Sequence, residues 1–180
     1  MNTKTWAKTI LNVQKYLDRV CAAIDECVNK KSTASFNVNS KNIYKNDCFY
    51  VSNYMLDLID RKKGLINLRV ICNNALKNMD SLSAKILVLK FIDRMPSLTI
   101  AKLLKLSERT YFRKLNVAYD NFENYLTNNG FNAEYFECNY KNEGWIIEVY
   151  DEIEKQTERA DNVITFTPIY LNNICVAMSK

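Results

Sequence analysis

The 180-residue chain contains no histidine. Histidine is the commonest general base and the commonest protein ligand of metal ions, so its absence rules out the Ser-His and Cys-His pairs used in much nucleophilic catalysis. A glycine-rich phosphate-binding loop is also missing, and the chain has only three glycines and two prolines. We therefore expect a protein that is not an enzyme and uses no cofactor, with a mostly helical fold and few tight turns.

Closely spaced cysteines are also missing. The six cysteines form no C-x-x-C pair, so a structural zinc site is not expected. No apolar run reaches the roughly 20 residues that cross a membrane, and the first residues lack the apolar core of a signal peptide. These absences favour a cytoplasmic protein with reduced thiols and no membrane partner. The cysteines are Cys21, Cys27, Cys48, Cys72, Cys138 and Cys175.

The net charge of +5 is unevenly distributed along the chain. Residues 1–80 carry 13 basic and 7 acidic side chains, and residues 81–116 carry 8 basic and 2 acidic ones. Residues 117–180 reverse the sign, with 4 basic and 11 acidic side chains. A basic body with an acidic last segment favours a protein that binds a polyanion, while the last segment does something else.

Two long helical patterns fill the first 80 residues. Over residues 5–29 the apolar positions are separated alternately by four and three residues, which predicts a helix with a heptad seam that packs on another helix. A second pattern covers residues 50–79, with a bend predicted near Gly64, and the polar residues 30–47 are predicted to connect the two. Two arrangements of these helices fit the pattern: an antiparallel hairpin within the chain and a seam between two copies in a homodimer. The first seam comprises Trp6, Ile10, Val13, Leu17, Val20, Ile24 and Cys27, and the second comprises Val51, Met55, Leu58, Leu65, Ile66, Cys72, Leu76 and Met79.

Beyond residue 80 the pattern indicates shorter elements. Asp80 or Ser81 can cap a helix that ends near Ile92, before the break at Pro96. We expect residues 131–142 to be irregular, 144–159 to be helical, and 163–169 to form a strand or an extended arm. The fold class is mainly all-α. The chain is predicted to divide into a long-helix scaffold or dimerisation region (1–80), a helix-turn-helix domain (81–127) and an acidic appendage (128–180).

The stretch 98–115, LTIAKLLKLSERTYFRKL, is predicted to be a helix-turn-helix. In the first helix (98–104) the small Ala101 lies where a crossing helix must approach closely. Lys105 and Leu106 form the turn, and Ser107 is a good N-cap for the second helix. The buried stripe of that second helix has gaps of four, three and four residues. It comprises Tyr111, Leu115, Ala118 and Phe122.

The opposite face of the second helix is suited to double-stranded DNA. Arginine forks match guanine edges or phosphates, and an amide matches adenine. Asp120 follows on the same face, so only the first three turns are expected to meet phosphate. The alternative is a helical hairpin whose basic face is merely solvated. The predicted DNA face comprises Arg109, Arg113 and Asn116, flanked by Thr110 and Phe112, with Lys102, Lys105, Lys85 and Lys90 placed near passing phosphates.

Residues 81–126, with LKFIDR, LTIAKLLKLS and SERTYFRKL in succession, resemble the fourth conserved region of sigma-70 family factors. The chain looks most similar to phage-encoded regulators whose C-terminal part is sigma-like. The resemblance implies promoter binding, activation of transcription and RNA polymerase as a partner. It also implies that residues 87–91 dock on the polymerase. The family's DNA-reading positions fall here on Ser107, Glu108, Arg109, Thr110, Phe112 and Arg113.

The sequence departs from this family at two positions and over one region. Lys105 stands where the family's turn usually has glycine, so it must adopt a left-handed conformation or shift the turn. The family usually has an acidic residue in the first helix. This chain has none there, and Thr99 stands just before Ile100. Nothing resembles the second conserved region, which melts promoters. The alternatives are a divergent stand-alone sigma factor and a helical adaptor that binds a protein through the N-terminal heptad seam.

Overall fold

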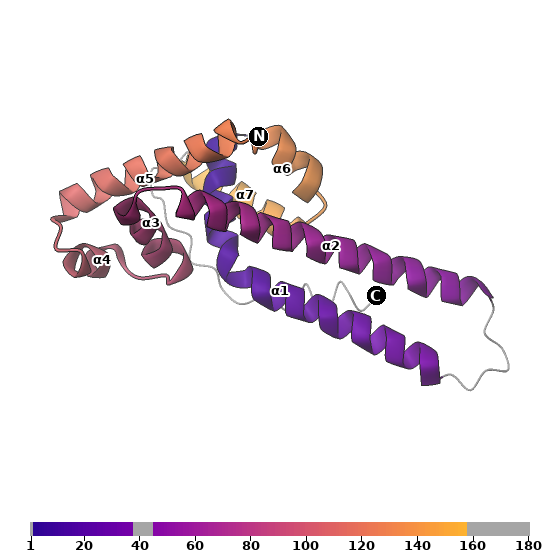
Figure 1. Cartoon of the computed structure of the whole chain (residues 1–180). Helices are drawn as coiled ribbons and strands as arrows, with labels where there is room; N and C mark the ends of the chain where they lie inside the picture. Colours follow the sequence, from indigo (N-terminus) through magenta and orange to yellow (C-terminus); the bar gives the residue numbers. More distant parts are fainter. Residues whose placement is uncertain (1, 38–44, 158–180) are drawn as a thin grey trace. The chain divides into compact units, whose positions relative to one another are not determined.

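The computed structural model describes residues 2–37 and 45–157 (Figure 1). Within these ranges the chain is helical and has no strand, which confirms the all-α prediction. None of the helices in these ranges is both long and apolar enough to cross a membrane. The elements are α1 (Thr3–Asn37), α2 (Lys45–Lys77), α3 (Ser81–Leu87), the π-helical turn η1 (Val88–Ile92), α4 (Ser97–Leu103), α5 (Glu108–Asn128), α6 (Ala133–Tyr140) and α7 (Gly144–Thr157).

The described residues form two compact units. Unit 1 contains residues 2–15 and 68–157, and unit 2 contains residues 16–37 and 45–67. Helices α1 and α2 therefore contribute residues to both units. The units are defined by packing and do not coincide with the three segments predicted from the sequence, whose division stays a prediction.

Unit 2 is a pair of helices, formed by the later part of α1 and the earlier part of α2 (Figure 1). Its buried apolar side chains come from both helices. Across the pair, the Lys62 ammonium donates to both carboxylate oxygens of Asp25, at 2.6 and 2.7 Å. The α1 seam is thus covered within the chain here, as the antiparallel hairpin alternative predicts. The buried residues are Leu17, Val20, Ile24, Leu58 and Leu65.

Both long helices extend further than the sequence predicts. α1 continues to Asn37 and α2 already begins at Lys45, so the predicted connection over 30–47 is wrong at both ends. Adding polar residues to an existing helix costs little, because propagation fixes only one residue for each new hydrogen bond. Gly64 does not interrupt α2. Ile66, predicted in the buried seam, is exposed, because the neighbouring Leu65 takes the buried position.

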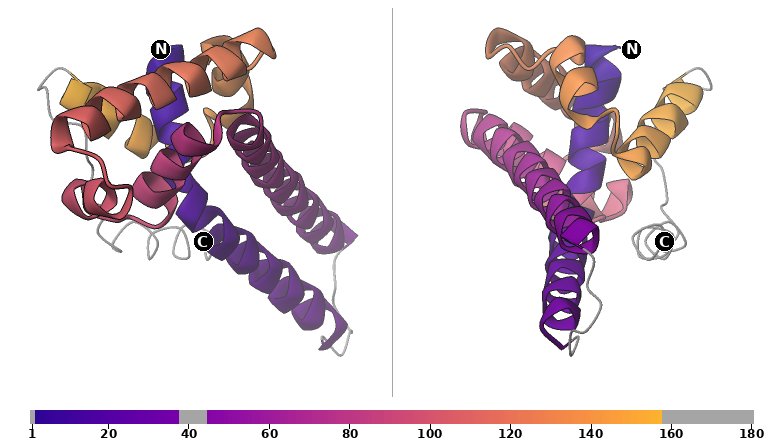
Figure 2. Two further views of the ribbon diagram at one scale, coloured as in Figure 1. Left: turned by 60° about the vertical axis from the view of Figure 1, so that its left-hand side comes forward. Right: turned by 90° about the vertical axis from the view of Figure 1, so that its right-hand side faces the viewer.

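In unit 1, the helices α3 and α4 both contact α5. In the left view of Figure 2, α4 and α5 follow one another through a short turn, with α3 beside them. All four residues of the predicted buried stripe of α5 are buried, as are Tyr119 and Leu126. The helix ends at Asn128, and Gly130 follows with a φ of 80°, a conformation that glycine adopts readily after a helix.

The first turns of α1 complete the core of unit 1 through Trp6, which is fully buried. Its ring centroid lies 5.5 Å from that of Phe136 in α6 and 4.9 Å from that of Tyr150 in α7. The prediction that residues 131–142 are irregular is therefore wrong. Asn132 caps α6 by accepting a hydrogen bond from the Tyr135 amide, and Phe136 stacks on Trp6. The helix predicted over 144–159 is confirmed to Thr157, and residues 163–169 lie outside the described residues.

Candidate nucleic-acid interface

The turn between α4 and α5 is a Schellman motif with a lysine at its left-handed position. Lys105 has a φ of 54°, so of the two outcomes expected where the family has glycine it adopts the left-handed conformation. The Leu106 amide donates to the Ala101 carbonyl at 2.9 Å, and the Lys105 amide donates to the Lys102 carbonyl at 3.1 Å. These two bonds satisfy the last carbonyls of α4 and close a tight turn. Ala101 is buried, and Leu106 is half-buried between the helices.

The start of α5 is fixed by its N-cap, as predicted. The Ser107 hydroxyl accepts a hydrogen bond from the Thr110 amide at 3.3 Å and lies 2.8 Å from the Thr110 hydroxyl. This cap leaves the other first-turn amides of a 21-residue helix pointing toward solvent, where the helix dipole favours negative charge. Glu108 is also in this turn and is exposed, so it offsets part of that positive potential.

The structure brings the predicted DNA-binding residues together on one exposed surface. We call this surface the α5 outer face. Phe112 is 48% exposed, and its ring packs edge-on against the buried Tyr111, with centroids 5.2 Å apart, so it presents an apolar edge at the start of α5. Thr110 is half-buried, while the other members are exposed. The face comprises Ser107, Glu108, Arg109, Thr110, Phe112, Arg113 and Asn116, with Lys102 and Lys105 beside it at the end of α4 and in the turn.

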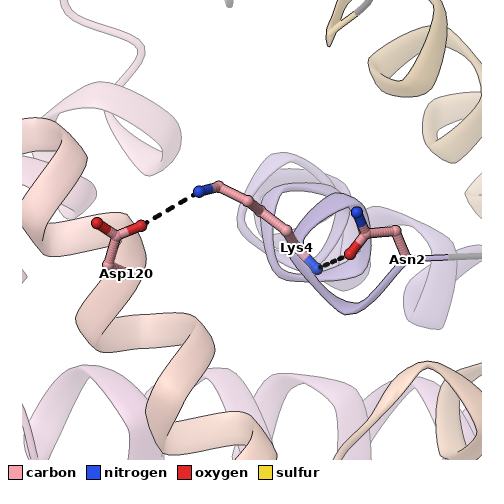
Figure 3. A network of polar contacts seen from close by, with 3 residues as sticks. All are labelled: Asn2, Lys4 and Asp120. Atoms are coloured by element: carbon pink, nitrogen blue, oxygen red, sulfur yellow. Dashed lines mark hydrogen bonds and ion pairs between the residues drawn. The ribbon is translucent and has the colours of Figure 1, made fainter.

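Asp120, expected to limit this face, has a basic partner (Figure 3). The Lys4 ammonium lies 3.2 Å from its carboxylate, and both side chains are about half exposed. One turn along α1, the Lys8 ammonium lies 5.7 Å from the centroid of the Tyr119 ring. Burial and the neighbouring Lys4 lower the pKa of Lys8. The α1 lysines thus add positive charge beside α5. Sequence reasoning missed them, because no local pattern links residues more than 100 positions apart.

Lys90 does not join the DNA face, contrary to the sequence prediction. It falls four residues after the buried Ile86, so its stem lies on the apolar stripe of its helix. Its ammonium donates to the Ser97 hydroxyl at 2.8 Å, and burial lowers its pKa. Lys85 is exposed and remains available to phosphate.

The segment implied to dock on polymerase, residues 87–91, is also largely inside unit 1. Leu87 and Phe91 are buried, and Val88 and Leu89 are half-buried. The exposed part of this segment is therefore too small to form a docking surface by itself. No cluster of acidic and cysteine side chains that could hold a metal ion occurs within residues 2–37 and 45–157.

Comparison with known proteins gives one match. Residues 51–123, less than half of the chain, match the model of a family described as "Protein of unknown function (DUF1492)". The matched stretch runs from the first turns of α2 into α5 and includes the whole turn between α4 and α5. No curated protein and no solved structure gives a significant match. The comparisons therefore leave the activity to be argued from the residues of the site.

Proposed function

We propose that this protein is a sequence-specific regulator of transcription that binds double-stranded DNA at promoters together with RNA polymerase. The observation that supports DNA binding most directly is the α5 outer face. Two exposed arginines and an exposed asparagine share one side of a capped helix, directly after a tight turn. If this basic surface served only to be solvated, neither the tight turn between α4 and α5 nor Asn116 would be needed.

Four side chains of this face have matching groups on DNA. The major groove of B-DNA admits one α-helix, and the first three turns of α5 would lie in it. Arg109 and Arg113 can each donate two hydrogen bonds to guanine, and Asn116 can pair with adenine in the same two-bonded way. Phe112 offers an apolar edge to a thymine methyl group. Lys102 and Lys105 would contact the phosphates and thereby fix the orientation of the helix.

The RNA polymerase partner rests on the resemblance to sigma-70 family factors. Because residues 87–91 are largely buried, contact with polymerase requires other exposed surfaces of the chain. A homodimer formed through the N-terminal helices would present two copies of α5. The DNA site would then consist of two half-sites, as for other dimeric helix-turn-helix proteins.

One observation favours a second function, that of a helical adaptor. The side of α2 opposite its buried stripe carries exposed apolar residues, among them Leu56 and Ile66. Such a face fits a partner helix better than it fits DNA. Binding of a protein partner at α2 is compatible with DNA binding at α5, so the two functions do not exclude each other.

A mobility-shift assay tests the DNA-binding proposal, using genomic fragments at about 50 and 200 mM salt. We expect salt-sensitive complexes with wild type and their loss with Arg109→Ala/Arg113→Ala. The matched control is Lys141→Ala/Lys155→Ala, which removes the same charge from exposed positions on unit 1 outside the face. Equal binding by the two double variants would show that α5 is not the reading helix.

A pull-down of RNA polymerase core by the purified protein tests the second half of the proposal. Retention of the core by wild type is the expected result. A protein that binds promoter fragments but retains no polymerase would be a DNA-binding regulator without the sigma-like partner. That outcome separates the two halves of the proposal.

A further inference from the structure

The helix α2 presents apolar side chains on two opposite sides. One side is buried within the chain, through residues such as Leu58 and Leu65. The other side carries five large apolar residues that are exposed. The four in unit 2 are called the α2 outer stripe, and Val70 (48% exposed) continues the same series in unit 1. Apolar residues scattered singly over a surface are normal, but an aligned row of them marks an interaction site. The stripe comprises Phe49 (70% exposed), Leu56 (57%), Ile59 (38%) and Ile66 (44%).

The spacing of the residues in the α2 outer stripe indicates which kind of structural element can pack on it. Phe49 and Leu56 are seven residues apart, as are Ile59 and Ile66, and the two pairs are offset by three residues. Ser52 and Lys63, both exposed, occupy the two remaining positions of the same heptad series. Such a row packs against another α-helix lying nearly parallel or antiparallel to it.

We propose that the occupant is the α2 outer stripe of a second copy of this chain, paired antiparallel about a twofold axis. With the axis between residues 57 and 58, Phe49 lies opposite the second copy's Ile66, and Leu56 lies opposite the second copy's Ile59. All four apolar residues then face apolar residues. This self-matching pattern is what an isologous interface requires, since both copies contribute the same patch.

Charge selects the antiparallel arrangement over the parallel one. In a parallel pair Lys63 would face the second copy's Lys63 in the seam, whereas the antiparallel pair places it opposite Ser52. On the flanks, Asp60 lies opposite Met55 and Lys62 lies opposite Asn53, so no like charges meet. Asp25 already neutralises Lys62 within its own unit, and Asp60 binds Lys63 at 2.8 Å. The proposal does not depend on DNA binding by α5.

Sedimentation equilibrium on full-length chains tests the proposal. We expect wild type to be dimeric at about 50 μM, and the dissociation constant to rise by at least about tenfold in Leu56→Lys and in Ile59→Glu. The matched control is Val117→Glu, which places a charge on a similarly exposed apolar position of α5 and should leave the dimer intact. Circular dichroism checks that every variant retains its helix content, which substitutions at exposed positions should not change.

Mixing Leu56→Lys with Ile59→Glu tests the register. In the antiparallel pair, an equimolar mixture places the introduced lysine of one copy opposite the introduced glutamate of the other at one crossing. At the other crossing Leu56 still lies opposite Ile59. The mixture should therefore recover dimers that neither variant forms alone. A monomeric wild type, or single variants that dimerise as well as Val117→Glu, would overturn the proposal. Failure of the mixture to recover dimers would overturn the antiparallel pairing.

Discussion

The helices α2 and α5 each bury one stripe of apolar side chains, and they differ in what the opposite side carries. On α5 that side holds Arg109, Arg113 and Asn116, with Phe112 as its large exposed aromatic. On α2 it holds the apolar outer stripe, interrupted by Ser52 and Lys63. Both helices stabilise the fold through buried apolar residues, which are small or aliphatic in α2 and include aromatic rings in α5.

This difference shows where functional information lies in an all-helical chain. The inner sides of α2 and α5 indicate only that each helix packs in the core. The outer sides indicate the chemistry of a partner, because nothing in the fold requires exposed arginines on α5 or exposed leucine and isoleucine on α2. We therefore propose that α5 binds a polyanion and that α2 binds another helix.

The largest expected effects come from the inner sides, where the two helices are alike. Phe122→Ala in α5 should lower the free energy of unfolding by about 3–5 kcal/mol, and Leu58→Ala in α2 by about 2–5 kcal/mol. Both side chains are almost completely buried, so truncation leaves a cavity. Asn116→Ala, on the outer side of α5, should change stability by no more than about 0.5 kcal/mol. Denaturant titration measures all three, and equal costs at inner and outer positions would contradict the assignment of the stripes.

The second-largest effect concerns DNA affinity, which should fall after a substitution on the outer side of α5 but not after one on α2. Arg113→Ala should weaken binding to a selected duplex by about 1–3 kcal/mol. Lys77→Ala removes the same charge from an exposed position at the end of α2, beyond the outer stripe, and should change the affinity much less. Fluorescence anisotropy with a labelled duplex measures both dissociation constants. Equal losses would mean that the chain binds DNA through net charge and not through a specific helix face.

A smaller effect concerns the turn that positions α5. Lys105→Gly should raise the free energy of unfolding by on the order of 0.5–1 kcal/mol, because glycine adopts a positive φ without the steric cost borne by lysine. Lys102→Gly, inside the last turn of α4, should have the opposite sign and cost about 1 kcal/mol. Thermal unfolding of the two variants gives the signs directly. Destabilisation by Lys105→Gly would show that this turn does not adopt the left-handed conformation.

The smallest effect is expected at the edge of the α5 outer face. Asp120→Asn removes a half-exposed ion pair with Lys4, so stability should change by no more than about 0.5 kcal/mol. DNA affinity should rise slightly, since a negative charge is lost from the helix that approaches phosphate. Asp151→Asn, an exposed acid on α7, is the control for general charge. Weaker DNA binding by Asp120→Asn would show that Asp120 itself contacts the DNA.

Most of α5 could be predicted from the sequence because its determinants are local. Ser107 precedes a stripe with regular gaps, and Gly130 follows it, so the cap, the buried side and the end of the helix are all encoded within about 25 residues. For Lys105 the sequence left two outcomes open, a left-handed conformation or a shifted turn, and the structure has the first. The side of α5 that faces solvent follows from the same periodicity.

The features that sequence reasoning missed depend on distant residues. α6 was not predicted, because its aromatic residues gain their packing partner, Trp6, from the other end of the chain. The pairing of Lys4 with Asp120 has the same origin. Lys90 was expected at the surface because of its charge, yet its aliphatic stem packs in the core while Ser97 satisfies its ammonium. The outer stripe of α2 was partly overlooked because Ile66 was assigned to the buried seam.

The salt dependence of DNA binding tests the central claim, that the outer face of α5 contacts DNA, most directly. The dissociation constant for a selected duplex would be measured from about 50 to 200 mM salt for wild type and for Arg109→Ala/Arg113→Ala. We predict that the double variant binds at least about tenfold more weakly and that its dependence on salt is shallower, because fewer counterions are released. A double variant with wild-type affinity and an unchanged salt dependence would contradict the claim.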